Sequence, residues 1–255
     1  MNPMSLMRSV SPDQWSRHPF AARLKHFVAL SERDLDSLWR VIETELVVKR
    51  HTDLVVDGYV YRKLCFIKEG FAFRYKLLRN GKRQIINVLL PGDVIGLPGG
   101  FLEKASYSVI AVSDLTLHVC AIDAYVQLCY NQPKFGLVLS WLAAQEAITN
   151  AEHIINVGRR TPAERLANFL LETHSRLASV DRAAKLSFDM PFSQEIMGDV
   201  LGLSVPHINR TFAKLRTDGL IKIKDRHVEF VDRPALEQLS QFQSLKLTRI
   251  PPSAV

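Results

Sequence analysis

A short run of side chains near the C-terminal end of this chain has the chemistry to read the edges of DNA bases. An arginine guanidinium can donate two parallel hydrogen bonds to guanine O6 and N7, and an asparagine amide can pair with adenine or hold a phosphate. Such groups read bases when they lie near the N-terminal end of an exposed helix. The predicted base-reading residues are Val205, Pro206, His207, Asn209 and Arg210.

Two short helices joined by a tight turn are predicted to present these side chains. Ser193 can cap a first helix that ends at Leu201, and Gly202 supplies the left-handed residue of the turn. Gly198 lacks a side chain and lets the helices cross closely, as a helix-turn-helix requires. Apolar contacts between the helices are expected from Ile196, Val200, Leu203, Ile208 and Leu215.

The second helix and the segment after it are predicted to hold the DNA backbone. Ser204 caps this helix, which runs to about Arg216, and Pro206 is tolerated because the first turn has no intrahelical N–H bond to lose. The runs 220–224 and 227–230 alternate and predict a β-hairpin wing. Residues suited to phosphate contacts are Ser193, Ser204, Lys214, Arg216, Lys222, Lys224 and Arg226.

A long helix upstream carries an apolar stripe. It opens after Pro133, and its apolar residues recur at spacings of four and three, which is the seam of a two-helix contact. Either a second copy or the helix's own domain could cover it. The helix is expected to end at a hinge, 158–160, before a new helix capped by Thr161 and Glu164. The predicted interface residues are Leu137, Trp141, Ala144, Ile148, Ala151 and Ile155.

The N-terminal half predicts a small β-barrel or roll. After a helix from Ser31 to about Glu43, the hydrophobic period changes to two. Residues 71–77 alternate and predict a strand, with Ala72, Arg74 and Lys76 on one side, and Asn80-Gly81 predicts a hairpin before the return strand 86–90. A further strand is expected over 108–120. Short strands at regular spacing are typical of rolls and barrels.

Composition places the chain among globular cytoplasmic proteins. Of 255 residues, 47% are hydrophobic, and 33 Lys and Arg outnumber 26 Asp and Glu, which permits a polyanionic partner. No apolar stretch reaches the roughly 20 residues that span a bilayer, and Met1–Ser16 lacks the apolar centre of a signal peptide. Three scattered cysteines argue against a disulfide framework, so we expect a reducing cytoplasm.

Other chemistries are less well supported. The loop 96–100 lacks the lysine and hydroxyl of a phosphate loop. His118 and Cys120 share a strand face and could ligate haem or a metal, but packing is the better interpretation. Nothing near Cys120 or Cys129 is expected to lower a thiol pKa for a redox switch. No hydrolase elbow or zinc-protease motif is present, so an enzyme is not predicted.

The layout resembles the Crp–Fnr superfamily of bacterial transcription regulators over roughly Leu24 to Leu239. The strongest stretch is 201–210, and the runs 65–70 and 91–96 look like the family's sensory β-roll. The resemblance implies a homodimer that binds a palindromic promoter site and affects RNA polymerase recruitment. It also implies that Arg210 reads a base.

Two departures from the family concern ligands and the half-site. Many members place a glutamate where this chain has Pro206, so the half-site should differ. Where the cyclic-AMP binders place a phosphate-neutralising arginine, this chain has Tyr107, which argues against cyclic AMP. No cysteine precedes Cys65, which argues against an iron–sulfur cluster, and no cofactor is predicted. A candidate effector pocket comprises Gly96, Leu97, Gly99, Tyr107 and Ser108.

The sequence therefore predicts an α+β fold with a β-roll like cyclic-nucleotide-binding jelly rolls, a long dimerisation helix and a winged helix-turn-helix. The function expected is a DNA-binding regulator controlled through the roll by an unidentified signal. The alternative is a small-molecule-binding module whose helix-turn-helix contacts protein. The predicted parts are a flexible N-terminus 1–20, the roll 21–132, the dimerisation helix 133–158, the DNA-binding domain 159–242 and a loose tail 243–255.

Overall fold

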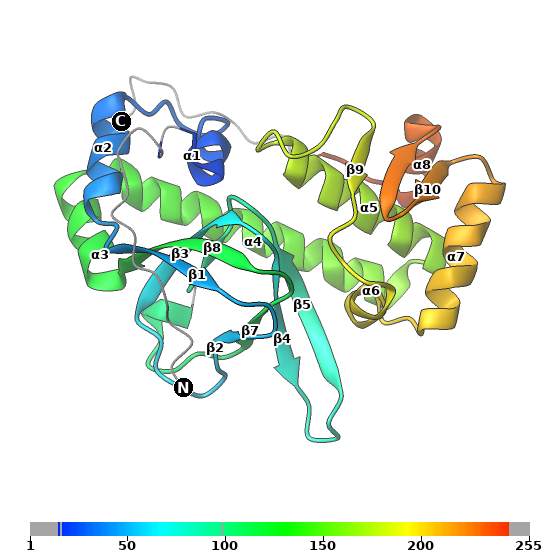
Figure 1. Ribbon diagram of the computed structural model, residues 1–255, viewed down its shortest axis with the longest axis horizontal. Coiled ribbons are helices and arrows are strands. Elements are labelled where there is room, and N and C mark those ends of the chain that lie inside the picture. The colour runs from blue at the N-terminus through cyan, green and yellow to red at the C-terminus, as the bar shows by residue number, and fades with distance from the viewer. Residues whose placement is uncertain (1–14, 16, 98, 245–255) are drawn as a thin grey trace. The chain divides into compact units, whose positions relative to one another are not determined.

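The computed structural model describes residues 15, 17–97 and 99–244, and these form two compact units (Figure 1). The first unit holds the described residues up to Lys76 together with Val88–Ile148. The second holds Leu77–Asn87 and the described residues from Thr149 onward. The loose tail predicted for 243–255 lies almost wholly outside the described residues.

Two four-stranded sheets form the roll, and five of the strand pairs within them are antiparallel. One sheet has the order β1-β8-β3-β6 and the other β2-β7-β4-β5. The strands are β1 (Thr44–Val48), β2 (Asp53–Val55), β3 (Lys63–Glu69), β4 (Ala72–Leu77), β5 (Arg83–Leu89), β6 (Val94–Ile95), β7 (Ser108–Ala111) and β8 (Leu115–Ala121). A short 3-10 helix spans Gly99–Phe101.

The single strand predicted over 108–120 is wrong, because the chain changes sheets there. β7 pairs with β2 and β4 in one sheet, whereas β8 pairs with β1 and β3 in the other. Between them the backbone N–H of Val112 donates to the carbonyl of Phe71. Both sides of β8 are largely buried, including His118 and Cys120. The alternation of residue types continues from β7 into β8, so it does not reveal the bend between the two strands.

In the part of the chain that the structure describes, four helices accompany the roll. They are α1 (Pro19–Leu24), α2 (Glu32–Arg40), α3 (Ile122–Asn131) and α4 (Lys134–Arg159), and the last residues of α4 belong to the second unit. Ser31 caps α2 as predicted and forms a reciprocal capping box with Asp34. The helix was expected to end at 158–160, and α4 ends within that range, at Arg159. The new helix then begins after Thr161, whose hydroxyl accepts from Glu164 N–H.

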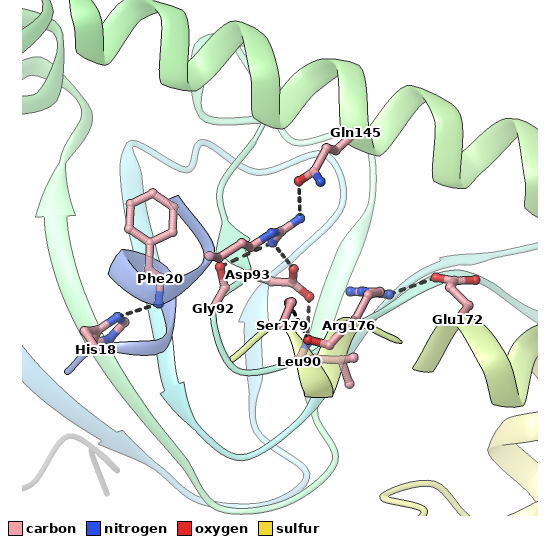
Figure 2. Close-up of polar contacts among 10 residues, drawn as sticks. His18, Phe20, Leu90, Gly92, Asp93, Gln145, Glu172, Arg176 and Ser179 are labelled. Carbon is pink, nitrogen blue, oxygen red and sulfur yellow. Dashed lines mark hydrogen bonds and ion pairs between the residues drawn. The ribbon is translucent and has the colours of Figure 1, made fainter. Parts of the chain in front are cut away.

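The flexible N-terminus predicted for 1–20 needs correction, because its described end is part of the core. Trp15 and Phe20 are fully buried, and their rings pack against Phe66 of β3. Figure 2 shows His18 accepting a hydrogen bond from the Phe20 N–H at 3.0 Å, which caps α1. The prediction failed because it considered the average apolar content of the segment, whereas two aromatic side chains are enough to anchor it in the core.

The second unit combines helices with a three-stranded sheet of order β10-β11-β9. Its elements are α5 (Pro162–Ala178), β9 (Ser187–Asp189), α6 (Gln194–Leu201), α7 (Val205–Thr217), β10 (Ile221–Lys224), β11 (His227–Phe230) and α8 (Arg233–Ser240). The predicted wing is β10 and β11, while β9 and α8 were not predicted. Among the described residues, no helix is both long and apolar enough to cross a membrane.

Candidate nucleic-acid interface

The turn between α6 and α7 has the geometry that the sequence indicates. Ser193 Oγ accepts a hydrogen bond from the N–H of Ile196 at 3.3 Å, and Gly202 ends α6 with φ of 65°. The Leu203 N–H donates to the Gly198 carbonyl at 3.0 Å. A Cβ added to Gly198 would lie 2.5 Å from the carbonyl oxygen of Leu203. The turn therefore packs against α6 at a position where only glycine fits.

Helix α7 has one buried and one exposed side. Ile208, Thr211, Phe212 and Leu215 face the core of the unit. Of these, Thr211 and Phe212 were not among the predicted contacts, and Thr211 Oγ1 donates to the His207 carbonyl at 2.8 Å. The predicted base-reading residues Val205, Pro206, His207, Asn209 and Arg210 are all exposed. The helix therefore presents its N-terminal half to solvent.

Arg210 is available for a partner outside the chain. Within the described residues, no ion pair or side-chain hydrogen bond of Arg210 is found, although α7 also carries the pair Lys214–Asp218 at 2.9 Å. Ser204 sits at the N-cap of α7 but makes no side-chain cap bond, and its Oγ lies 3.3 Å from His207 Nδ1.

The wing places cations at the surface of the second unit. Lys222 and Lys224 on β10 are exposed, and the tight turn to β11 is made by Asp225 and Arg226 with φ of 48° and 72°. Arg226 is partly engaged, because its Nε donates to the Met190 carbonyl at 3.1 Å. Two lysines of the wing are thus better placed for phosphates than Arg226.

The apolar stripe on α4 is mostly uncovered. Leu137, Ile148 and Ile155 are 40%, 37% and 44% exposed. Ala144 and Ala151 are exposed as well. Trp141 differs from the prediction, because its ring is 6% exposed and stacks on Phe27 of its own unit at 4.8 Å.

Two of the candidate effector residues of the roll, Leu97 and Tyr107, are in contact, and Arg74, which was not among the candidates, joins them. Tyr107 is buried, and its hydroxyl donates to the Leu97 carbonyl at 2.7 Å. Ser108 Oγ accepts from the Asp57 N–H at 3.0 Å. Arg74 also donates to the Leu97 carbonyl, at 2.8 Å, and is 2% exposed. The sequence pattern placed Arg74 in a strand without assigning it a partner.

The cysteines and buried histidines are surrounded mainly by core side chains. Among the described residues, no group of three or more potential ligands is close enough to hold a metal ion. Burial raises the pKa of Cys65 to about 11 and that of Cys120 to about 12. Burial likewise lowers the pKa of His118. These groups are therefore neutral near pH 7.

Comparison with known proteins gives consistent matches for both units. Residues 45–131 match the cyclic nucleotide-binding domain, and residues 164–239 match the Crp-like helix-turn-helix domain. The transcriptional activatory protein AadR of Rhodopseudomonas palustris is 31% identical over 172 residues, which is 68% of this chain and 71% of AadR. The nitrogen fixation regulation protein FixK of Bradyrhizobium diazoefficiens is 30% identical over 174 residues, 68% of this chain and 72% of FixK.

Solved structures agree with this assignment. The structure of FixK2 from Bradyrhizobium japonicum superposes with a TM-score of 0.71 at 26% identity, over 79% of this chain and 98% of FixK2. The predicted α+β architecture, with an antiparallel roll, helices and a C-terminal helix-turn-helix, is therefore confirmed.

Proposed function

Because this chain belongs to the Crp–Fnr superfamily, whose members include FixK- and Fnr-type transcription regulators, we propose that α7 enters the major groove of a two-fold symmetric promoter site. The observation that carries this proposal is the exposed N-terminal half of α7, where Arg210 has no acidic partner among the described residues. A buried or neutralised arginine could not give two hydrogen bonds to guanine.

The base-reading set is proposed to be Val205, Pro206, His207, Asn209 and Arg210. Arg210 would specify a guanine, and Asn209 an adenine or a phosphate. Pro206 has no side-chain hydrogen-bonding group, so the base opposite it is selected by shape and apolar contact. The proposed phosphate contacts come from Ser193, Ser204, Lys214, Arg216, Lys222 and Lys224, with a smaller share for Arg226.

The proposed dimer uses the exposed side of α4. Leu137, Ala144, Ile148, Ala151 and Ile155 would pack against the same residues of a second copy, with Trp141 supporting the helix from its own unit. A two-fold dimer of this kind requires half-sites about one helical turn apart, roughly 10 base pairs between centres. At a promoter the bound dimer would affect recruitment of RNA polymerase.

Neither cyclic AMP nor an iron–sulfur cluster is part of the proposed function. Tyr107 and Leu97 supply no cationic side chain for a cyclic phosphate. Among the described residues, Cys65, Cys120 and Cys129 do not gather with other potential ligands into a group that could hold a metal ion. The roll is proposed to act through α4.

The test is selection of bound duplexes from a random pool, followed by titration of the selected site. We expect a palindrome with half-sites one turn apart, bound more weakly as salt rises. Binding that shows no preference over a scrambled duplex would contradict the proposal. A preference that survives Arg210→Ala would instead favour the alternative, in which the helix-turn-helix contacts protein.

A further inference from the structure

An ion pair between a buried arginine and a partly exposed glutamate connects the roll to α4. The Arg74 side chain comes from β4 and is 3% exposed, and its Nη1 donates to Oε1 of Glu146 on α4. Nη2 donates to the Leu97 carbonyl at 2.8 Å. The guanidinium carbon lies 4.3 Å from the centre of the Tyr107 ring. One side chain thus joins two elements of the roll to the long helix.

Arg74 contacts the Leu97 carbonyl and the Tyr107 ring, two groups of the candidate effector pocket with which a bound ligand could otherwise interact. The Leu97 carbonyl accepts from both Arg74 and the Tyr107 hydroxyl. The Tyr107 ring is covered by the guanidinium, which is a favourable cation–π arrangement. The positive charge that is missing from position 107 is therefore supplied from β4, and Glu146 of the same chain neutralises it.

A second arginine binds α4 one residue earlier. Arg23 of α1 donates to Gln145 Oε1 at 2.7 Å and is paired with Asp93. Asp93 is fixed in turn by the Leu90 N–H at 2.7 Å (Figure 2). Consecutive residues of α4, Gln145 and Glu146, are thus held by two arginines from different parts of the first unit. This double attachment sets the position of α4 relative to the roll.

We infer that Arg74 replaces a small-molecule effector in this chain, so that its ion pair with Glu146 holds α4 in the DNA-binding arrangement without a ligand. The inference rests on the proposed function. A buried guanidinium is strongly destabilised when its acid is removed, because the charge then has no partner. Loss of Glu146 should therefore release α4 or expose Arg74, and weaken DNA binding at a distance.

The experiment measures affinity for the selected site with purified, extensively dialysed dimer. Wild type should bind without added ligand, and about 1 mM cyclic AMP or cyclic GMP should leave its affinity for the site unchanged. Glu146→Ala should weaken binding about tenfold, within the usual range of coupling between sites. The double variant Arg74→Leu with Glu146→Leu should bind better than Glu146→Ala, because no charge is left unpaired.

The matched control is Asp123→Asn. Asp123 lies on α3, pairs with exposed Arg62 and is 80% exposed, so this variant removes the same charge without a buried partner. It should bind like wild type. Thermal melts of each variant separate a folding defect from weaker binding by a folded dimer.

Two results would overturn the inference while leaving the regulator function intact. One is wild-type protein that binds its site only when a small molecule or cell extract is added. The other is folded Glu146→Ala dimer with wild-type affinity. Loss of all sequence-specific binding in every condition would instead contradict the proposed function itself.

Discussion

Replacing Gly198 with alanine tests whether the crossing of α6 and α7 depends on a missing side chain. The new Cβ would lie 2.5 Å from the Leu203 carbonyl oxygen, closer than real Cβ contacts allow. The obstacle is backbone, and the Leu203 N–H is also bonded to the Gly198 carbonyl at 3.0 Å. The turn therefore has to move as a unit, which would shift the start of α7.

Two effects of opposite sign decide the magnitude. Alanine stabilises a helix interior by about 0.5–1 kcal/mol relative to glycine. Overpacking a filled site costs about 1–3 kcal/mol. We expect Gly198→Ala to lower the free energy of unfolding by about 1–2 kcal/mol, or roughly 3 °C in Tm per kcal/mol for a chain of this size. Affinity for the selected site should fall as well.

Gly158→Ala is the matched control, because a Cβ there meets nothing within 4 Å and the residue lies in α4 with helical φ. The same chemical change should raise the free energy of unfolding by about 0.5–1 kcal/mol. Urea denaturation of the full-length variants, with DNA titration alongside, measures both. Gly198→Ala protein as stable as Gly158→Ala, with undiminished affinity, would refute the close crossing.

Three further outcomes are expected. Arg210→Ala should cost about 1–3 kcal/mol of binding free energy at the selected site and weaken the preference for its base. Lys214→Ala should lower the affinity for all sequences alike and reduce the slope of log affinity against log salt concentration by about 1. Titrations on selected and scrambled duplexes distinguish the two effects. Native Cys120, with its pKa raised to about 12, should react with iodoacetamide at pH 8 far more slowly than after unfolding, and equal rates would contradict its burial. Burial lowers the pKa of His18 and His118 from 6.5, so the stability of the fold should be greatest above pH 6.5 and should fall as the pH drops and the two imidazoles become protonated. Thermal melts of His118→Asn at several pH values should show a weaker pH dependence than wild type. A pH dependence as steep as that of wild type would contradict this cause.

Structural features that depend only on residues a few positions apart in the sequence could be predicted. Ser31, Thr161 and Ser193 cap helices through bonds to residues three positions later, so type and spacing alone identify them. Gly202 adopts a positive φ because it has no Cβ, and this property can be read from the residue type alone. The exposed side of α7 follows equally from helical periodicity, since its buried residues recur at spacings of three and four.

Features that depend on distant partners were missed or misplaced. Trp15 belongs to the core only because Phe66 and Trp39 are brought beside it. The bend between β7 and β8 exists because the two strands pair in different sheets. Neither pairing leaves a periodic signal, and a run of alternating residues is the same on one straight strand as on two consecutive short ones.

Arg74 shows why function is harder to read than fold. Alternation in this strand groups Arg74 with Ala72 and Lys76 but names no partner for it, and an isolated buried guanidinium would be too costly to retain. Its burial is tolerated because Glu146, which is 72 residues later, arrives on another element with an opposite charge. A lone charged residue in a strand therefore cannot be assigned to solvent until every helix that packs on the sheet is considered. In this chain that missing acid lies on the helix whose exposed apolar side is proposed to join two copies, so the ion pair and the proposed dimer contact lie on the same helix.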